Sequence, residues 1–191
     1  MGGPGDSGRG GGENLAKGTP MVRLRPVRDD DWGLIRGWLG RPDIERWWGP
    51  KASSEAAVML AMGSAHAIAR IIEADGAPVG YAHALDATMW GETLPDALLP
   101  GTWDIDLFIA SSAHRNQGLG QRALAMIRDE VFSTTLAVEV CIFAPLANER
   151  AVRAYEKAGF RWRSVWNEPD AGASWFMTAE RPPRSTAGKA Q

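Results

Sequence analysis

The sequence predicts a mixed α/β fold built on one central sheet. Apolar segments of strand length alternate with helical patterns between residues 22 and 178. The segments 66–73 and 79–85 meet at Asp75-Gly76, a dipeptide that suits a tight antiparallel turn. The segment 136–143 is a nearly continuous apolar run, as expected of a strand with both faces covered. We therefore expect both antiparallel and parallel pairing in the sheet.

The remaining elements follow from capping residues and periodicity. After the Gly-rich turn, Leu119, Ala123, Met126, Ile127 and Val131 form one predicted buried stripe on a helix. The expected strands are 22–27, 66–73, 79–85, 103–109, 136–143, 160–166 and 173–178. The other expected helices run from an Asp30 cap to Leu39, from Ser53 or Ser54 to near Gly63, and over 148–158.

The length of 191 residues favours one domain with flexible ends. Residues 1–20 contain eight glycines and few apolar side chains, so we expect a disordered leader. Residues 181–191 are expected to form a flexible tail. The folded domain is then 21–180.

Charge and composition exclude several classes of protein. With 21 basic and 23 acidic side chains, the net charge of −2 gives no drive toward nucleic acid or anionic membranes. The sequence has no 18-residue apolar run or signal peptide, and Cys141 is its one cysteine, which together favour a cytoplasmic location. No His/Cys/Asp cluster has the spacing of metal ligands. Monomer and homodimer both stay open.

The segment 114–120 is a Gly-rich turn between a strand and a helix. Backbone N–H groups at a helix N-terminus suit a pyrophosphate, and Arg115 would add positive charge at the mouth. A plain turn packed against the sheet is the alternative. Gly118-x-Gly120-x-x-Ala123 also matches a dinucleotide fingerprint, but eight residues separate Ile109 from Gly118, so an NAD-dependent oxidoreductase fits poorly.

Asn148, Ala151 and Tyr155 share one face of the later helix, since they are spaced i, i+3 and i+7. Their amide and phenol groups could bind a ligand together. Alternatively, Asn148 is a helix cap and Tyr155 a core residue.

Together these motifs resemble the GNAT acetyltransferase superfamily. Its cofactor motif stands here as Arg115-Asn116-Gln117-Gly118-Leu119-Gly120, and its later motif as Asn148, Ala151, Tyr155, Gly159 and Phe160. The resemblance implies a mostly antiparallel sheet of about seven strands flanked by helices, with a V-shaped splay between strands 103–109 and 136–143. It also implies acetyl-CoA as co-substrate. Residues 115–120 would hold its pyrophosphate, while Phe108, Ile109, Asn148 and Ala151 would hold its pantetheine arm. Tyr155 would protonate the departing thiolate.

The acceptor is expected to be a cation. Between Ile71 and His114 there is no Lys or Arg but several acids: Glu73, Asp75, Asp86, Glu92, Asp96, Asp104 and Asp106. Asp104, Asp106 and Phe108 should share one strand face, and mutual repulsion should raise the pKa of one carboxyl, as a general base requires. A solvated strand face is the alternative, and His83 is a second candidate base.

A closer resemblance links residues 39–49, the Trp90 loop and Ile105-Asp106 to aminoglycoside 6′-N-acetyltransferases and siderophore-type relatives. It implies that Asp106 is the base. Trp47, Trp48, Asp86, Trp90, Glu92 and Asp104 are the expected acceptor-binding residues, although Trp47 and Trp48 could simply bury a loop between helices. One departure is Ala144 in Ile142-Phe143-Ala144-Pro145, where those enzymes carry an acid.

The sequence therefore predicts direct transfer of acetyl from acetyl-CoA to a small cationic amine, with an aminoglycoside favoured. Cys141 is not needed as a nucleophile. A siderophore precursor or a protein N-terminus is the alternative acceptor. A noncatalytic acetyl-CoA-binding module is the alternative from another class.

Overall fold

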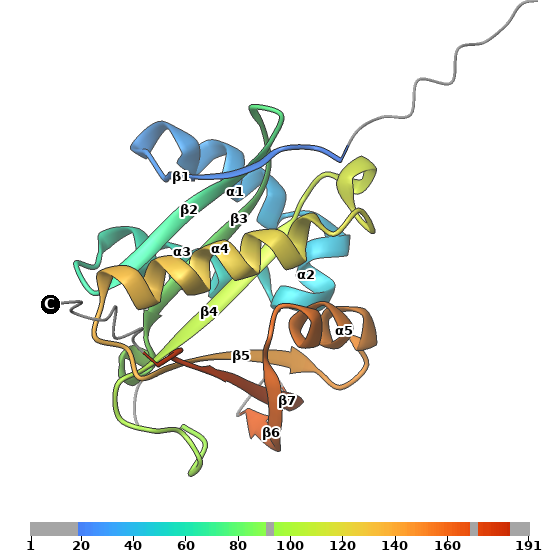
Figure 1. Cartoon of the computed structure of the whole chain (residues 1–191). Helices are drawn as coiled ribbons and strands as arrows, with labels where there is room; N and C mark the ends of the chain where they lie inside the picture. The colour runs from blue at the N-terminus through green and yellow to red at the C-terminus, as the bar shows by residue number, and fades with distance from the viewer. Residues whose placement is uncertain (1–18, 91–93, 169–171, 184–191) are drawn as a thin grey trace, which may run out of the picture.

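A computed structural model describes residues 19–90, 94–168 and 172–183. Its centre is a seven-stranded sheet in the order β1-β2-β3-β4-β5-β7-β6 (Figure 1). Among the described residues, only β4 and β5 pair in parallel, which confirms the mixed, mostly antiparallel sheet. The strands are β1 Val22–Pro26, β2 Ala67–Ala74, β3 Ala77–Asp86, β4 Thr102–Ile109, β5 Glu139–Pro145, β6 Arg161–Glu168 and β7 Gly172–Glu180.

Helices cover both faces of this sheet (Figure 1). We call the two sides the α4 face and the α1–α3 face. The helix α4 lies across the strands, and Val152 and Tyr155 of α5 pack against the same core as α4. The helices are α1 Trp32–Leu39, α2 Pro42–Trp48, α3 Lys51–Gly63, α4 Leu119–Thr134 and α5 Glu149–Lys157.

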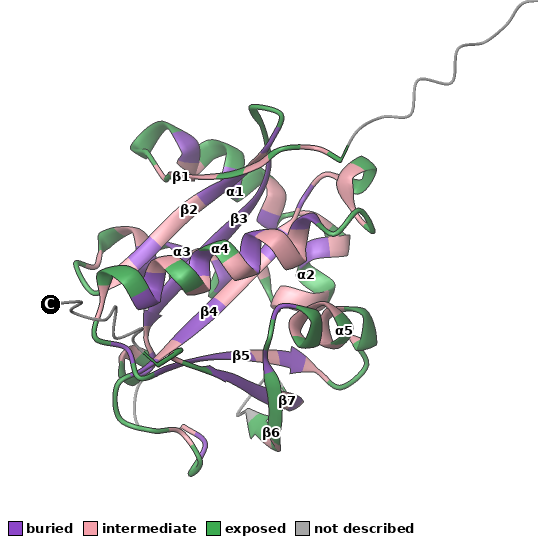
Figure 2. Cartoon of the chain, viewed as in Figure 1, coloured by how far each residue is buried: buried purple, intermediate pink, exposed green. Residues whose placement is uncertain are grey.

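Each face of the sheet has its own apolar core. Many of the buried residues lie in the central strands (Figure 2). On the α4 face, Ile127 and Val131 pack in one cluster with Ile72 and Ile105 of the sheet. The second cluster, on the α1–α3 face, includes Ile35 and Val58 with Ile71, Tyr81 and Phe108. Burial on both sides explains why the central strands are so apolar.

The N-terminal half departs from the expected helices. Residues 42–48 form α2 rather than a connecting loop, and Pro42 in its first turn is a typical helix-start signal. The helix α3 begins at Lys51, ahead of both expected serines. Asp31, not Asp30, stands before α1, because Asp29–Asp31 form a 3-10 turn. Met126 was also placed wrongly, since it is exposed on α4.

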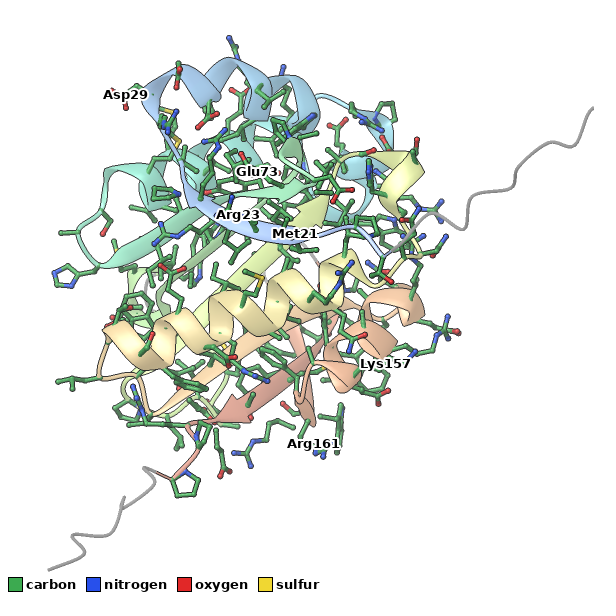
Figure 3. The ribbon with its side chains drawn as sticks, turned by 45° about the horizontal axis from the view of Figure 1, so that its top comes forward. Met21, Arg23, Asp29, Glu73, Lys157 and Arg161 are labelled. Atoms are coloured by element: carbon green, nitrogen blue, oxygen red, sulfur yellow. The ribbon has the colours of Figure 1, made fainter. Side chains whose placement is uncertain are left out.

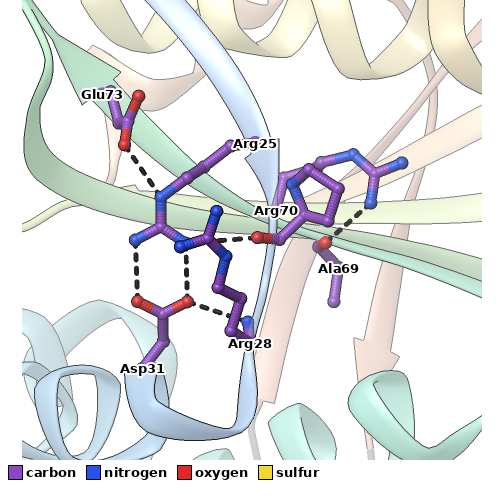
Figure 4. A network of polar contacts seen from close by, with 7 residues as sticks. Arg25, Arg28, Asp31, Ala69, Arg70 and Glu73 are labelled. Atoms are coloured by element: carbon purple, nitrogen blue, oxygen red, sulfur yellow. Dashed lines mark hydrogen bonds and ion pairs between the residues drawn. The ribbon is translucent and has the colours of Figure 1, made fainter.

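An ion-pair network fixes the β1 edge of the sheet (Figure 4). The Arg25 guanidinium donates two hydrogen bonds to Asp31, at 2.6 and 2.7 Å, and its Nε donates to Glu73 Oε1 at 2.8 Å. The hydrogen bond from Arg25 is the main reason that the pKa of Asp31 is lowered. Because Glu73 belongs to β2, the network joins β1, β2 and the start of α1.

The sheet is split at its centre. The parallel pairing of β4 with β5 covers Thr102–Asp104 and Glu139–Cys141 only, whereas β4 continues to Ile109 and β5 to Pro145. On its other side β4 stays paired with β3 as far as Gly80 and Ile109. This geometry confirms the V-shaped splay between the two strands.

Gly80 allows β3 to approach β4 closely at the wide end of the splay. A Cβ atom there would lie 2.2 Å from the carbonyl oxygen of Phe108, in contact with backbone rather than with a movable side chain. Just beyond it, Val79 O accepts hydrogen bonds from the N–H groups of both Ala110 and Ser111. The close approach therefore sets the path of β4 beside the opening.

We expect Gly80→Ala to lower the free energy of unfolding by about 2 kcal/mol or more, because the backbone must move to relieve the clash. Urea denaturation measures the change. Gly37→Ala is the matched control, since nothing lies within 4 Å of a Cβ at that exposed site in α1 and alanine favours helix. Equal stability of wild type and Gly80→Ala would contradict the role given to Gly80.

Candidate active site

The Gly-rich turn leads directly into α4. Asn116 and Gly118 adopt positive φ values of 62° and 73°, and Gly118 is the N-cap of the helix. The first backbone N–H groups of a helix have no acceptor within it, and they carry the positive end of its dipole. A Cβ at Gly118 would meet nothing within 4 Å, and one at Gly120 only Ile109 Cγ1 at 3.7 Å. These features fit the diphosphate of a nucleotide carrier.

Arg115 stabilises this turn through hydrogen bonds and an ion pair within the protein. Its Nε donates to Ile109 O at 2.9 Å and its Nη2 donates to Ala110 O at 3.2 Å. Nη2 also pairs with Asp43 Oδ2 at 2.5 Å, which ties the turn to α2. Gln117 Nε2 similarly donates to Ala113 O at 2.6 Å. The charge of Arg115 is therefore paired with a carboxylate in this structure.

The helix α5 carries the second motif along one face. Asn148 Oδ1 accepts the N–H of Ala151 at 3.2 Å, so Asn148 caps the helix. Gln121 Nε2 donates to Lys157 O at 3.3 Å and joins the start of α4 to the end of α5, where Figure 3 labels Lys157. The two motifs thus lie beside each other.

Tyr155 is half-buried against the core of the α4 face. Burial raises its pKa above the ordinary value, and the negative charges of Asp106 and Asp104 raise it further. The phenol is therefore fully protonated at neutral pH and lies within electrostatic reach of both carboxylates. Since Tyr155 belongs to the α4 face, these charges act on it from the other side of the sheet.

The expected acidic face of β4 is present. Asp104 and Asp106 alternate with Ile105, which packs in the core of the α4 face, so the carboxylates lie on the α1–α3 face. Asp104 is buried and accepts hydrogen bonds from Trp90 Nε1 at 2.7 Å and from Cys141 Sγ at 3.6 Å. Burial and Asp104 raise the pKa of the Cys141 thiol well above its usual value, so this thiol is a poor nucleophile.

An aromatic cluster lies beside Asp106. We use this name for Trp48, Tyr81, His83, Trp90 and Phe108. The Trp48 ring centroid is 4.8 Å from that of Phe108, 5.7 Å from His83 and 6.0 Å from Tyr81, and His83 is 6.3 Å from Trp90. His83 is the cross-strand partner of Asp106. The structure thus brings two of the expected tryptophans to the acidic face.

Two other expected acceptor residues make different contacts. The guanidinium of Arg46 lies 4.7 Å from the ring centroid of Trp47. Asp86 Oδ1 accepts from Thr88 N and Oγ1, at 3.0 and 2.7 Å, and so caps the turn that leads to Trp90. Glu92 lies outside the described residues.

The aromatic cluster contains buried polar atoms with no hydrogen-bond partner among the described residues. They are Trp48 Nε1, Tyr81 Oη and both ring nitrogens of His83. Leaving such groups unsatisfied costs about 1–3 kcal/mol each, so they indicate a place for water or a polar ligand. Tyr81 was missed by the sequence analysis. Its signal is the i+2 spacing to His83, but the register that sets both beside β4 is a long-range property.

The described residues show neither a metal-ligand cluster nor a membrane-spanning helix. Within residues 19–90, 94–168 and 172–183, no group of three or more His, Cys, Asp or Glu side chains is placed to hold a metal ion. In the same residues, none of the helices combines the length and the apolar character that crossing a bilayer requires.

The chain is similar to known acetyltransferases. The family model for the acetyltransferase (GNAT) domain matches residues 27–167. Aminoglycoside N(6′)-acetyltransferase type 1 of Klebsiella pneumoniae is 26% identical over 174 residues, which cover 85% of each chain. The crystal structure of aminoglycoside acetyltransferase AAC(6′)-Ib with coenzyme A and kanamycin matches with a TM-score of 0.74 and 26% identity, over 84% of this chain and 95% of that one.

A second structure of AAC(6′)-Ib, in complex with paromomycin and acetyl-CoA, matches with a TM-score of 0.72 and the same identity, over 84% of this chain and 93% of that one. The splayed sheet, the Gly-rich turn and the paired motifs agree with these matches. The chain therefore belongs to the GNAT acetyltransferase family, as an N-acetyltransferase that uses acetyl-CoA as its co-substrate.

Proposed function

We propose that this enzyme acetylates a primary amine of a small cationic acceptor by direct transfer, and that the 6′-amine of an aminoglycoside is the favoured acceptor. The observation that carries the proposal is the position of Asp106 and Tyr155, which approach the opening between β4 and β5 from opposite faces of the sheet. The relatives named above act on aminoglycosides or bind them, which supports the acceptor class.

Acetyl-CoA would lie with its diphosphate on the turn at Arg115, Asn116, Gln117, Gly118, Leu119 and Gly120. The N–H groups at the start of α4 are the donors that this requires. Beyond Asp104, β4 has no registered partner on the β5 side among the described residues. The backbone of Phe108 and Ile109 would therefore be available to the pantetheine arm, with Asn148 and Ala151 on the opposite side.

Asp106 is the proposed general base. An acceptor amine arrives as an ammonium ion, and transfer of its proton to the carboxylate leaves a neutral nucleophile and a neutral acid. His83 suits this role less well, because protonation would place a cation in a fully buried site beside the incoming ammonium. A carboxylate also attracts the acceptor before reaction.

Tyr155 is the proposed general acid. When the amine nitrogen bonds to the acetyl carbon and the C–S bond breaks, the sulfur leaves as a thiolate and takes the phenolic proton. The phenolate then recovers a proton from the acylated nitrogen, which becomes the neutral amide. The raised pKa of Tyr155 keeps the phenolic proton in place until the thiolate forms. A positioned acid or base of this kind contributes about 10²- to 10⁴-fold to the rate.

The proposed acceptor-binding residues are Trp47, Trp48, Asp86, Trp90, Glu92 and Asp104. Trp48 and Trp90 both contact His83, the cross-strand partner of Asp106.

Ala144 favours a second candidate function. It is buried in β5, where aminoglycoside enzymes carry an acid, so an acceptor with fewer positive charges would also fit. A siderophore precursor or a protein N-terminus is the corresponding acceptor class.

We expect Asp106→Asn and Tyr155→Phe each to lower kcat at least about tenfold, because each removes one proton transfer. The assay follows CoA release with acetyl-CoA and kanamycin. Thermal unfolding and calorimetric affinity for CoA serve as controls and should change little. Unchanged turnover in both variants would remove the two catalytic roles.

Gly118→Ala tests the proposed diphosphate site. A side chain at a φ of 73° is strained by about 1 kcal/mol, so the turn should shift and the Kd for CoA should rise about fivefold or more in calorimetry. Gly33→Ala in α1, where nothing lies within 4 Å of a Cβ, should leave the Kd unchanged. Equal affinity in wild type and Gly118→Ala would place the diphosphate elsewhere.

The pH dependence of stability tests the environment of His83. Burial lowers its pKa from 6.5 to about 4, so between these values the unfolded chain binds a proton that the folded chain does not. Folding stability should therefore fall as the pH drops from 6.5 toward 4, by roughly 2–3 kcal/mol from this group. His83→Gln should lose less stability than wild type between pH 7 and pH 4.5 in urea denaturation. Identical losses would show that His83 is readily protonated in the folded protein.

A further inference from the structure

The side of the opening across from Asp106 is aromatic. Asp104 and Cys141 form the last registered pair of β4 and β5, and their side chains touch on the α1–α3 face, with Sγ 3.6 Å from Oδ1. Side chains alternate along a strand, so the next residues on this face are Asp106 on β4 and Phe143 on β5. These two residues are therefore the first on either side of the gap.

Phe143 belongs to an aromatic shelf, by which we mean Phe143, Trp166 and Phe176. The Phe143 ring stacks on Phe176 with centroids 5.3 Å apart and planes at 21°, and it lies 5.1 Å from the Trp166 ring. Phe176, the cross-strand partner of Phe143, is fully buried, whereas Phe143 and Trp166 are half-exposed. The shelf thus presents a supported apolar surface beside the opening.

The opposite side of the gap, formed by β3 and β4, carries polar and charged side chains. Across the sheet the order on this face is His83 on β3, Asp106 on β4, the gap, and then Phe143 on β5. His83 and its neighbour Tyr81 carry buried polar atoms that have no hydrogen-bond partner among the described residues. One wall therefore carries the Asp106 carboxylate in front of these buried polar groups, while the other consists of aromatic rings in which the Trp166 indole N–H is the polar group.

A saturated ring that bears an amine and hydroxyl groups matches both walls. Its edge supplies hydrogen bonds to the polar wall, and the C–H groups of its face contact the aromatic shelf. A linear polyamine carries equal charge but has no such face. The shelf contains no acid, so on this face the carboxylates of Asp104 and Asp106 lie on the β4 side of the gap.

We propose that Phe143 determines specificity by stacking against the C–H face of the acceptor ring that carries the reacting amine, so that the enzyme prefers aminosugar rings to linear polyamines. This inference rests on the proposed transfer at Asp106 and adds the shape of the acceptor to it. Phe143 acts on binding of the ring and takes no part in proton transfer.

The test compares kanamycin with the linear triamine spermidine as acceptors, with CoA release as the readout. Phe143→Ala should raise KM for kanamycin about five- to tenfold, while KM for spermidine changes less than about twofold and kcat changes little for either. Phe143→Leu keeps the apolar bulk without the flat ring and should give an intermediate KM. If Phe143→Ala fails to fold, Phe143→Leu and Trp166→Ala supply the same comparison.

Trp162→Ala is the matched control. Trp162 is 59% exposed on β6, and it contacts Trp175, which packs against the core of the α4 face, so it lies away from the shelf. Its removal should leave both KM values unchanged. If Phe143→Ala changes KM equally for the two acceptors, or changes neither KM, the role of Phe143 is wrong but the proposed transfer at Asp106 stands. Absence of turnover by the wild-type enzyme with both acceptors overturns the proposed acceptor class, and the inference with it.

Discussion

The parting of β4 from β5 is the constraint on which the rest of the structure depends. Side chains on opposite faces of an intact sheet point away from each other, so a base on one face and an acid on the other could not act on one reaction centre. Pairing that ends at Asp104 and Cys141 opens a passage between the faces. Asp106, the proposed base, lies on the α1–α3 face, and Tyr155, the proposed acid, packs in the core of the α4 face. The gap therefore makes general acid–base chemistry possible on this fold.

The gap must be held open against the tendency of strand edges to pair. Close contact of Gly80 with Phe108 keeps β4 on β3, and the Arg115 guanidinium fixes the end of β4 to the Gly-rich turn and to Asp43 in α2. Below the gap, the contacts of Trp90 and Cys141 with Asp104 close the narrow end. Separate apolar cores on the two faces supply the stability that offsets the buried, unbonded polar groups near Asp106.

Local signals in the sequence predicted most of the sheet and the two motif-bearing helices. Asp75 and Gly76 have the positive φ values that their hairpin turn requires. The helix α2 was missed because seven residues are too short to show a helical period. The partners of Arg115 and Asp104 were not predictable, since Asp43 and Trp90 reach them only through the tertiary fold. The aromatic cluster depends in the same way on strand register and on the position of α2.

The unequal walls of the opening also bear on which amine of an acceptor reacts. A polycation held by charge alone could turn and present any of its amines to Asp106, because Coulomb attraction is not directional. A polar wall at His83 and Tyr81 facing a flat ring at Phe143 restricts the plane of the acceptor, and hydrogen bonds to fixed atoms restrict rotation within that plane. One amine then lies in line with the gap through which the acetyl group is delivered. Regioselectivity in this enzyme would thus come from the shape of the two walls, while the carboxylates supply attraction and the removal of a proton.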